Sequence, residues 1–456
     1  MAPKVPLRCL SLVIALACVA CGGSTATDTS STNPTETDAT APDATATDAA
    51  EIDPTQVDPV SDAELTLSGT SLELDIAADG RALVVGGGLD GYKAVSWGPQ
   101  GWYAPIEIVP PTSLEDPSGA YVGVIDALHA VALGLRGEAW VLYSRLTGPL
   151  YAADSVIELY ARHRPASALG FAVWAPPELV ARVGVGVVSD PTPARASLVF
   201  SASGLVGVVW SQRDEPVSVR VRDPGGVWGP AEVLDSSTSN GSPLLQINAD
   251  SSDNVIVVST NGSGTRSWQR TPQGWTATGI ITSATDVRAA TSDDGVIRLV
   301  FDSTLGLVSS RHSPDGAAQE NLSFGANHYL VELAASVGEQ ALFAYASDEL
   351  DTIPLDGPVH GLLVTRRTPG VVDWSTPEQY DSGPVSSVQL ALNSHGEAIA
   401  FWKGSTLRYR RFGSSEAVSF DGSGYLPSAA ALAEDGRALL GWSFPYENDL
   451  HVRWVE

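Results

Sequence analysis

Short apolar runs alternate with polar turns along the chain from residue 61 to residue 456. The runs are rich in Val, Leu, Ala and Ile, and the segments between them are rich in Gly, Pro, Asp and Ser. No segment keeps the 3.6-residue period of an amphipathic helix, so the pattern predicts short β-strands joined by turns. We therefore expect an all-β fold over this range.

One unit recurs about eight times in this range. An apolar run leads into a polar turn, a second apolar run follows, and six residues after the turn residue there is usually an aromatic side chain. The turn residues are Gly80, Gly137, Gly204, Asp253, Gly295, Gly338, Gly396 and Gly436. Their shortest spacings, 40 to 43 residues, match a four-stranded propeller blade, and the longer spacings indicate insertions in loops.

A tryptophan marks a further strand in several units, where it follows a turn and precedes an apolar run with Pro near its start. These residues are Trp102, Trp174, Trp228, Trp275 and Trp374. Each unit thus reads as four strands. A lone four-stranded sheet cannot bury both of its faces, whereas copies arranged around an axis can. We predict a β-propeller of eight four-stranded blades, with seven blades as the alternative.

The two ends of the repeat region complement each other. The last unit ends with LHVRWVE as its third strand, and no fourth strand follows. The segment from Glu64 to Leu67 precedes the first full unit and has no other role in the pattern. We expect this N-terminal segment to supply the missing outer strand and to close the ring.

The repeat resembles bacterial surface propellers with sialidase-like or BNR-like blades, over most of residues 61–456. The Asp-box of that class, Ser-x-Asp-x-Gly-x-Thr-Trp, is absent, because Ser292–Gly295 has neither its spacing nor its Trp. A sialidase would also need an arginine cluster, a tyrosine nucleophile and acidic partners. The family's N-terminal arginine motif is missing, since Arg81 occupies a repeated turn position that it shares with Arg437.

The N-terminus has the pattern of an export signal. Lys4 and Arg8 precede a short apolar run that is too short for a stable membrane-spanning helix. The run ends in CVACGG, which resembles the lipobox of bacterial lipoproteins, with Cys18 where that family usually has Leu. The resemblance implies a signal peptide at residues 1–20 and a lipidated Cys21. In Gram-negative lipoproteins, Asp after the lipidated Cys often marks a protein that stays at the inner membrane. This chain has Gly22 at that position, so the resemblance implies the outer membrane of a Gram-negative bacterium.

The segment after the lipobox differs in composition from the rest of the chain. Residues 21–60 are rich in Thr, Asp and Ala and contain no Lys, Arg or aromatic residue. Such a segment has too little apolar surface to offset the entropy of ordering its backbone. We expect a disordered tether between the lipid anchor at Cys21 and a propeller at residues 61–456.

Charge and motif content limit the chemistry. The chain has 26 Lys and Arg against 53 Asp and Glu, a net charge of -27, which argues against nucleic-acid binding. All three cysteines lie within the first 21 residues, which excludes a disulfide scaffold and a Cys-based zinc site. The seven histidines show no metal-ligand spacing, and no GxSxG, HExxH, P-loop or GxGxxG motif is present. We predict no catalytic residue, no metal and no cofactor.

These observations favour a binding or scaffold module of the cell envelope, with a glycan or a protein as partner. Two alternatives stay open: a glycan-cleaving hydrolase of sialidase-like type, and a purely structural envelope protein. Paired carboxylates, or a Tyr with an acid and arginines, converging in the central funnel would indicate the hydrolase. The acidic net charge favours a neutral sugar, a cation or a basic protein over an anionic polymer.

Loop lengths indicate where a ligand would bind. In a propeller, the loops between second and third strands share one face with the loops between blades, and the tight turns lie on the opposite face. The insertions fall mainly in the first class, and binding residues usually lie on such loops. We expect ligand contacts from Tyr151, Tyr446, Arg213 and Asp348. Residues 348–357 are acidic, which we read as a solvated loop rather than a Ca²⁺ site.

The aromatic residues that follow the turns allow two interpretations. These residues are Tyr143, Trp210, Phe301, Tyr345, Trp402 and Trp442. Packing between blades is the favoured role, because the second strand of a blade is buried. A stacking platform for a flat-faced ligand near the funnel mouth is the alternative.

Overall fold

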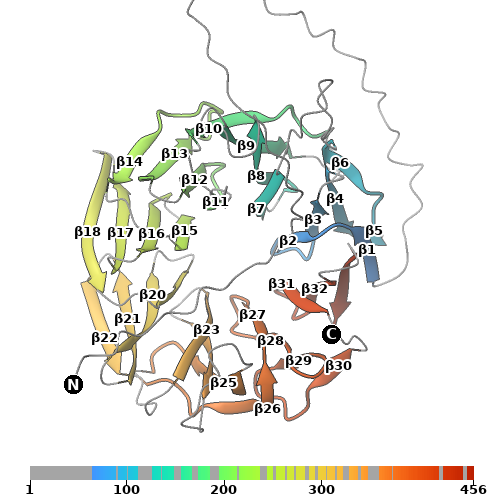
Figure 1. Cartoon of the computed structure of the whole chain (residues 1–456), viewed down its shortest axis with the longest axis vertical. Coiled ribbons are helices and arrows are strands. Elements are labelled where there is room, and N and C mark those ends of the chain that lie inside the picture. Colours follow the sequence, from blue (N-terminus) through green and yellow to red (C-terminus); the bar gives the residue numbers. More distant parts are fainter. Residues whose placement is uncertain are drawn as a thin grey trace, which may run out of the picture. The chain divides into compact units, whose positions relative to one another are not determined.

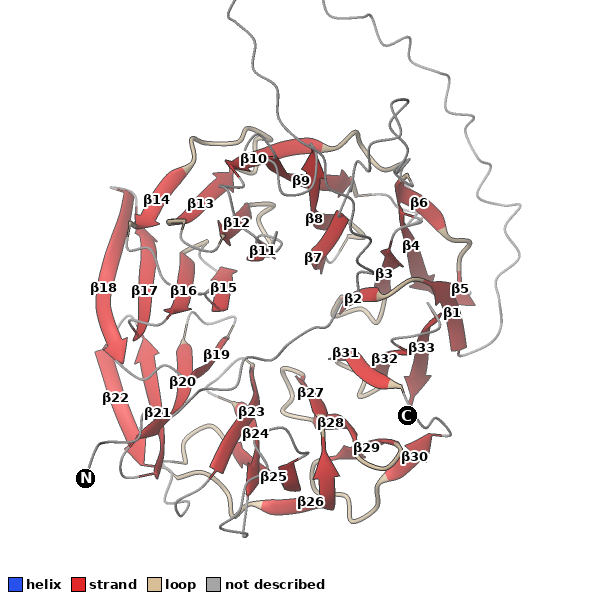
Figure 2. Cartoon of the chain, viewed as in Figure 1, coloured by secondary structure: helices blue, strands red, loops and turns tan. Residues whose placement is uncertain are grey.

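The structure, a computed structural model, covers the repeat region. It describes residues 64–456 apart from residues 89–90, 100, 111–125, 135, 148–155, 167–172, 185–194, 213–214, 237–243, 250–252, 262–263, 272–273, 283–286, 293–295, 304–305, 314–315, 322–327, 337–339, 348–358, 372, 421–424 and 445–448. Within these residues every long regular element is a β-strand (Figure 2). None of them forms a helix that is long and apolar enough to cross a membrane.

Eight antiparallel sheets form a ring, so the prediction of an eight-bladed propeller is confirmed (Figure 1). Blade 1 consists of β2 (Ser71–Ile76), β3 (Ala82–Gly88), β4 (Gly91–Gly98), β5 (Gly101–Trp102) and β6 (Ile106–Val109), and blade 2 of β7 (Asp126–Leu133), β8 (Ala139–Thr147), β9 (Val156–Arg164) and β10 (Glu178–Gly184). Blade 3 consists of β11 (Arg195–Phe200), β12 (Val206–Ser211), β13 (Val217–Arg222) and β14 (Glu232–Asp235). Blade 4 consists of β15 (Leu244–Ala249), β16 (Val255–Asn261), β17 (Gly264–Thr271) and β18 (Gly274–Thr282). In blade 1, β5 and β6 both pair with β4 and together make the outer edge.

Blades 5 to 8 repeat the same order from the inner to the outer strand. Blade 5 consists of β19 (Val287–Thr291), β20 (Ile297–Ser303), β21 (Gly306–Ser313) and β22 (Gly316–Asn321), and blade 6 of β23 (His328–Ala335), β24 (Ala341–Ser347), β25 (Val359–Arg367) and β26 (Glu378–Val385). Blade 7 consists of β27 (Ser387–Leu392), β28 (Ala398–Lys403), β29 (Leu407–Arg411) and β30 (Val418–Phe420). Blade 8 consists of β31 (Leu426–Leu432), β32 (Ala438–Phe444), β33 (Asp449–Val455) and β1 (Glu64–Ser68). The first strands of successive blades contact one another, and β31 contacts β2, so the circle is complete.

The ring closes as the sequence predicts. β1 pairs antiparallel with β33 in blade 8, from Glu64 opposite Arg453 to Ser68 opposite Asp449. Leu67 is buried in the apolar cluster between blades 8 and 1. A strand from the N-terminal side of the ring therefore completes the last blade and joins the two ends of the repeat.

The repeated turn explains why the pattern is visible in the sequence. Among the described turn residues, Gly80, Gly137, Gly204, Gly396 and Gly436 all have φ between 81° and 95°. The turn of blade 4 has Asp253 at this place, with φ 62°, and no other described non-Gly residue has a positive φ. This left-handed conformation favours Gly and tolerates Asp, which is why these types recur.

The core is divided among the blades rather than gathered in one place. The described residues form eight buried apolar clusters, one at each contact between neighbouring blades. The aromatic residues after the turns belong to these clusters, with exposures of 7% or less. The structure thus supports packing between blades as their role. The full burial of one large apolar side chain stabilises the folded state by about 1.5–3 kcal/mol.

In blades 2, 3 and 7, an arginine at one position of the third strand donates to a carbonyl of the preceding blade. The Nε of Arg220 on β13 donates to Gly229 O at 2.7 Å in its own blade, and its Nη1 donates to Val180 O at 2.8 Å on β10. Arg162 on β9 similarly bonds Ala175 O and, on β6, Ile108 O. Arg410 on β29 does the same toward Gln379 O on β26, at 2.9 Å. These side chains fasten each blade to the outer strand of its predecessor.

Candidate functional site

The predicted ligand residues lie outside the described residues. Tyr151, Arg213, Asp348 and Tyr446 each fall in sequence between the second and third strands of a blade: β8 and β9, β12 and β13, β24 and β25, and β32 and β33. Cys21, the signal segment and the tether also lie outside the described part of the chain. The described strands confirm which strand comes first, second, third and fourth in each blade. The prediction that the long loops share one face depends on this order.

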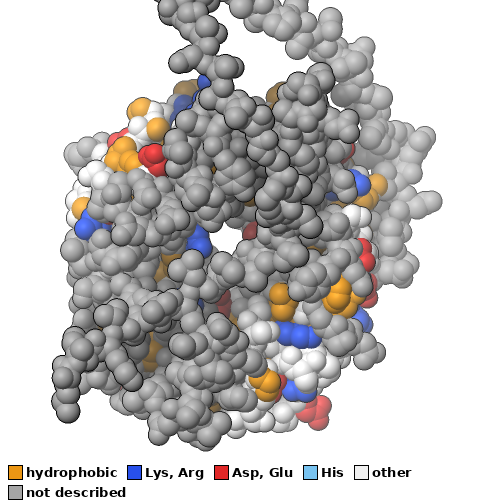
Figure 3. Space-filling view, in the orientation of Figure 1, with side chains coloured by type: hydrophobic (Ala, Val, Ile, Leu, Met, Phe, Trp, Pro, Cys, Tyr) orange, Lys and Arg blue, Asp and Glu red, His pale blue; other side chains and the backbone are white. Residues whose placement is uncertain are grey.

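A cavity of about 520 Å³ lies in the channel at the centre of the ring. Its walls come from the first strands of seven blades and from the ends of several tight turns. The lining residues are Asp75, Ile76, Ser197, Gln246, Ile247, Ala290, Ala334, Ala335, Ser336, Leu390, Ala391, Leu392, Asn393, Ser394, Ala430, Ala431, Leu432 and Glu434. The space-filling view shows an opening in the middle of the ring (Figure 3).

One carboxylate of the cavity comes from blade 1 and joins two blades. Asp75 is the fifth residue of β2. Its Oδ2 accepts a hydrogen bond from the Leu133 amide of blade 2 at 2.7 Å, and its Oδ1 accepts one from the Ile76 amide at 2.8 Å. Asp75 thus joins blade 1 to blade 2 at the wall of the cavity.

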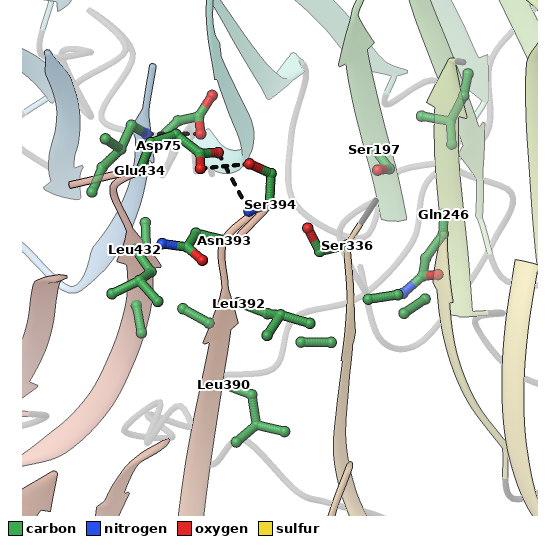
Figure 4. A pocket seen from close by; sticks show the side chains of 18 residues that line it. Asp75, Ser197, Gln246, Ser336, Leu390, Leu392, Asn393, Ser394, Leu432 and Glu434 are labelled. Carbon is green, nitrogen blue, oxygen red and sulfur yellow. Dashed lines mark hydrogen bonds between the residues drawn. The ribbon is translucent and has the colours of Figure 1, made fainter. Parts of the chain in front are cut away.

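The second carboxylate belongs to the tight turn of blade 8. Glu434 Oε2 accepts a hydrogen bond from the Ser394 hydroxyl at 2.6 Å, and Oε1 accepts one from the Ser394 amide at 3.4 Å. His395 Nδ1 lies 3.3 Å from Glu434 Oε2 at the exposed rim. Figure 4 shows Asp75, Glu434 and Ser394 together on one side of the cavity, across from Ser197 and Gln246.

Gln246 presents an oxygen without a protein partner. Its Nε2 donates to the Ala289 carbonyl of the next blade. Its Oε1 is buried and accepts no hydrogen bond from the described residues. A buried amide oxygen of this kind normally receives a donor from protein, water or ligand. Gln246 therefore marks a place on the wall where a donor fits.

In six blades a polar residue occupies the fourth position before the tight turn, and two of these residues, Ser197 and Gln246, line the cavity. Strand register places at this position Glu73, Ser197, Gln246, Arg288, Glu332 and Gln389. Burial raises the pKa of the partly buried Glu73 to about 7. Burial also raises the pKa of Glu332, and the Leu333 amide and the nearby Arg288 charge oppose that rise.

The described histidines lack the arrangement of a metal site. Burial lowers the pKa of His129 on β7 to about 4, and its Nε2 lies 2.8 Å from Ser144 Oγ. His163 stacks on Trp140 with ring centroids 4.4 Å apart. Within the described part of the chain, no three His, Cys, Asp or Glu side chains gather as metal ligands would.

Comparison with known proteins supports the fold. No known family and no curated protein matches the chain. Among solved structures, the Dos1 propeller matches with a TM-score of 0.53 and 8% identity, covering 88% of this chain and 95% of its own. Virginiamycin B lyase from Staphylococcus aureus matches with a TM-score of 0.41 and 10% identity, over 86% and 99% of the two chains. The fucose-specific lectin from Aleuria aurantia has a TM-score of 0.36 and 14% identity, over 64% and 95%.

The likeness to the Dos1 propeller supports a β-propeller fold and nothing finer. Identities this low support the fold alone, and the two lower TM-scores carry no argument. The resemblance to sialidase-like blades, the lipobox and the outer-membrane address stay predictions. Function must therefore be argued from the chain itself.

The cavity residues carry a sequence signal that the repeat analysis missed. A polar residue at the fourth position before the turn recurs in six of the inner strands, although those strands are otherwise apolar. Aligning the repeats by their turns and searching each column for polar types would have found Ser197 and Gln246. Glu434 and Ser394 sit in the turns themselves and carry no such periodic signal.

Proposed function

We propose that this protein is an exported, lipid-anchored envelope protein whose propeller acts as a binding or scaffold module for a glycan or a protein. The closed ring of eight blades carries the proposal. A closed ring has fixed strand ends, and loops held on fixed ends can present a ligand surface. The tether and the lipobox-like Cys21 would hold that surface away from a membrane.

The described chemistry favours binding over hydrolysis. In the cavity, Asp75 accepts hydrogen bonds from backbone amides and Glu434 from Ser394, and no Tyr is among the described residues that line it. The buried tyrosines Tyr143 and Tyr345 lie in clusters between blades rather than at the cavity wall. A hydrolase would need an acid and a base or nucleophile facing one reacting atom.

A binding experiment tests the proposed face. The unlipidated chain carrying Cys21→Ala is applied to a glycan array and to envelope extracts. Tyr151→Ala and Tyr446→Ala are expected to weaken capture, because they remove stacking surface from the long-loop face. Arg213→Ala and Asp348→Ala test the polar contacts on the same face.

Matched controls come from the opposite face. Arg81 and Glu397 belong to tight turns, so Arg81→Ala and Glu397→Ala should leave capture unchanged. Capture that responds only to these two controls would show that the face is wrong. Hydrolysis of an aryl glycoside or a sialoside by the chain would instead support the hydrolase alternative.

A labelling experiment tests the anchor. In a Gram-negative host fed a radioactive fatty acid, the wild-type chain should be labelled and fractionate with the outer membrane. Cys21→Ala should abolish the label, and Cys18→Ala should retain it, because Cys18 is not the expected acceptor. A fully acylated Cys21→Ala chain would overturn the assignment.

A further inference from the structure

We propose that the channel cavity is a second binding site, separate from the long-loop face, for a small organic cation that carries at least one primary ammonium group. The site does not depend on the partner proposed above. It would take diamines, amino sugars or similar molecules rather than neutral sugars or anions.

The size of the cavity suits a small molecule. Its volume of about 520 Å³ falls within the usual range for small-molecule sites, roughly 300–1,000 Å³. Small Ala residues line much of the wall, and Leu390, Leu392 and Leu432 add apolar surface. Such a wall fits the carbon skeleton of a compact ligand.

The polar groups of the wall are mostly acceptors. Asp75 and Glu434 are carboxylates from neighbouring blades, and no Lys or Arg is among the described residues that line the cavity. The Oε1 of Gln246 is buried without a donor from the described residues. An ammonium group supplies N–H donors and a positive charge, so it complements these groups as a neutral polyol cannot.

Glu73 is a second acid on the strand that carries Asp75. It lies two residues before Asp75 on β2, so both side chains leave the same face of the strand. Its carboxyl has no hydrogen bond or ion pair to the described residues. The described strands that pack against β2 are β3, β7, β31 and β32, and Asp126 and His129 on β7 are their titratable residues. None of these strands brings a Lys or Arg to Glu73.

Among the six polar residues at the fourth position before a tight turn, the one basic residue is occupied elsewhere. Arg288 on β19 lies near Glu332 on β23 of the next blade, and its charge opposes the rise that burial causes in the pKa of Glu332. These are blades 5 and 6, whereas Glu73 and Asp75 belong to blade 1. The described lining residues from blades 1 and 8 therefore include two carboxylates and no Lys or Arg.

The test must separate a specific site from the general attraction of an acidic protein for cations. The full chain carrying Cys21→Ala is titrated calorimetrically with 1,5-diaminopentane in 150 mM NaCl, and 1,5-pentanediol serves as the uncharged match. Glucosamine and glucose form a second matched pair. We expect saturable one-to-one binding of the two amines and none of the diol or glucose.

Two neighbouring acids provide the matched variants. Glu434→Gln removes one charge at the cavity wall, and Asp435→Asn removes one charge at an exposed ion pair with Arg437. Glu434→Gln should weaken the diamine at least tenfold, and Asp435→Asn less than twofold. Equal losses, equal binding of the diol, or no saturable binding by the wild type would each overturn the proposal.

A second variant and a pH series keep the test decisive. If Glu434→Gln lowers the melting temperature, Ser197→Leu fills the cavity from blade 3 and should also abolish binding. Diamine affinity should rise from pH 6 to pH 8, because the Glu73 carboxyl ionises with a pKa of about 7. His129, with a pKa of about 4, stays neutral over this range. Glu73→Gln should flatten the rise, and an unchanged rise would remove Glu73 from the site.

Discussion

Blades 2, 3 and 7 differ from blades 4, 5 and 6 at one position of the third strand. In the first group this residue is Arg162, Arg220 or Arg410, whose guanidinium bonds to a carbonyl of the preceding outer strand. In the second group the equivalent residues are Trp268, Ser310 and Thr365, opposite Val257, Leu299 and Phe343. The backbone is the same, but the contact at the outer edge is not.

The two groups satisfy the same interface with different chemistry. Trp268 joins an apolar cluster between blades 3 and 4, so it fills space. Thr365 Oγ1 donates to Ser375 O at 2.7 Å within its own blade. An arginine instead reaches two carbonyls in two blades, with its stem packed along the interface. The comparison shows that the inner strands use the same apolar packing all round the ring. The contacts of the outer strands, in contrast, differ from blade to blade.

Removing an arginine should have the largest effect. Arg220→Met keeps the apolar stem but leaves the carbonyls of Val180 and Gly229 without their donor. We expect a loss of about 2–3 kcal/mol in the free energy of unfolding. Urea denaturation followed by tryptophan fluorescence measures it. Arg437→Met is the control, because Arg437 pairs with Asp435 at 2.8 Å within the tight turn of its own blade. Equal losses in the free energy of unfolding of the two variants would show that the contact between blades gives Arg220 no special stabilising role.

The corresponding change in the other group should cost less. Thr365→Val leaves the Ser375 carbonyl without a donor but breaks nothing between blades. We expect about 1 kcal/mol of destabilisation in the same denaturation experiment. A loss larger than that of Arg220→Met would reverse the ranking of the two groups.

Hydrogen exchange measures the Arg220 contact strand by strand. β10 receives this contact at Val180. We expect Arg220→Met to speed the exchange of the paired amides of β10 about tenfold, which corresponds to about 1.4 kcal/mol. The amides of β29 in blade 7, which Arg220 does not contact, should keep their rates. Equal acceleration in both strands would mean that the arginine acts on global stability and not on the strand that it contacts.

The smallest effect is expected at a surface arginine of the first group. Arg182 on β10 pairs with Glu158 at 3.0 Å, but its side chain is 67% exposed. Arg182→Met should change the free energy of unfolding by less than about 0.5 kcal/mol, because exposed pairs contribute little. A loss near that of Arg220→Met would mean that charge, rather than contact between blades, explains the difference.

The sequence predicted what is local and repeated. The turn residues follow from conformational preference. The order of four strands in each blade and the closing strand at Glu64 follow from the spacing of apolar runs. Asp253 shows how directly the turn conformation selects residue type, since it replaces Gly in a left-handed position.

The cavity and the arginine contacts could not be predicted in the same way. The cavity wall combines residues from seven blades, and each, such as Gln246 or Asp75, is one polar position in an apolar strand. Arg220 meets Val180 across 40 residues of sequence, at a distance set by the angle between blades. The four predicted ligand residues on the long loops lie outside the described residues and stay predictions.

The closing strand has a mechanical consequence. β1 is held in blade 8 by five residue pairs with β33 and by the burial of Leu67. Tension on the chain before Glu64 therefore acts first on the strand whose release would open the ring. If the tether transmits force from an anchored Cys21, the strength of attachment and the integrity of the propeller are set by the same short ladder.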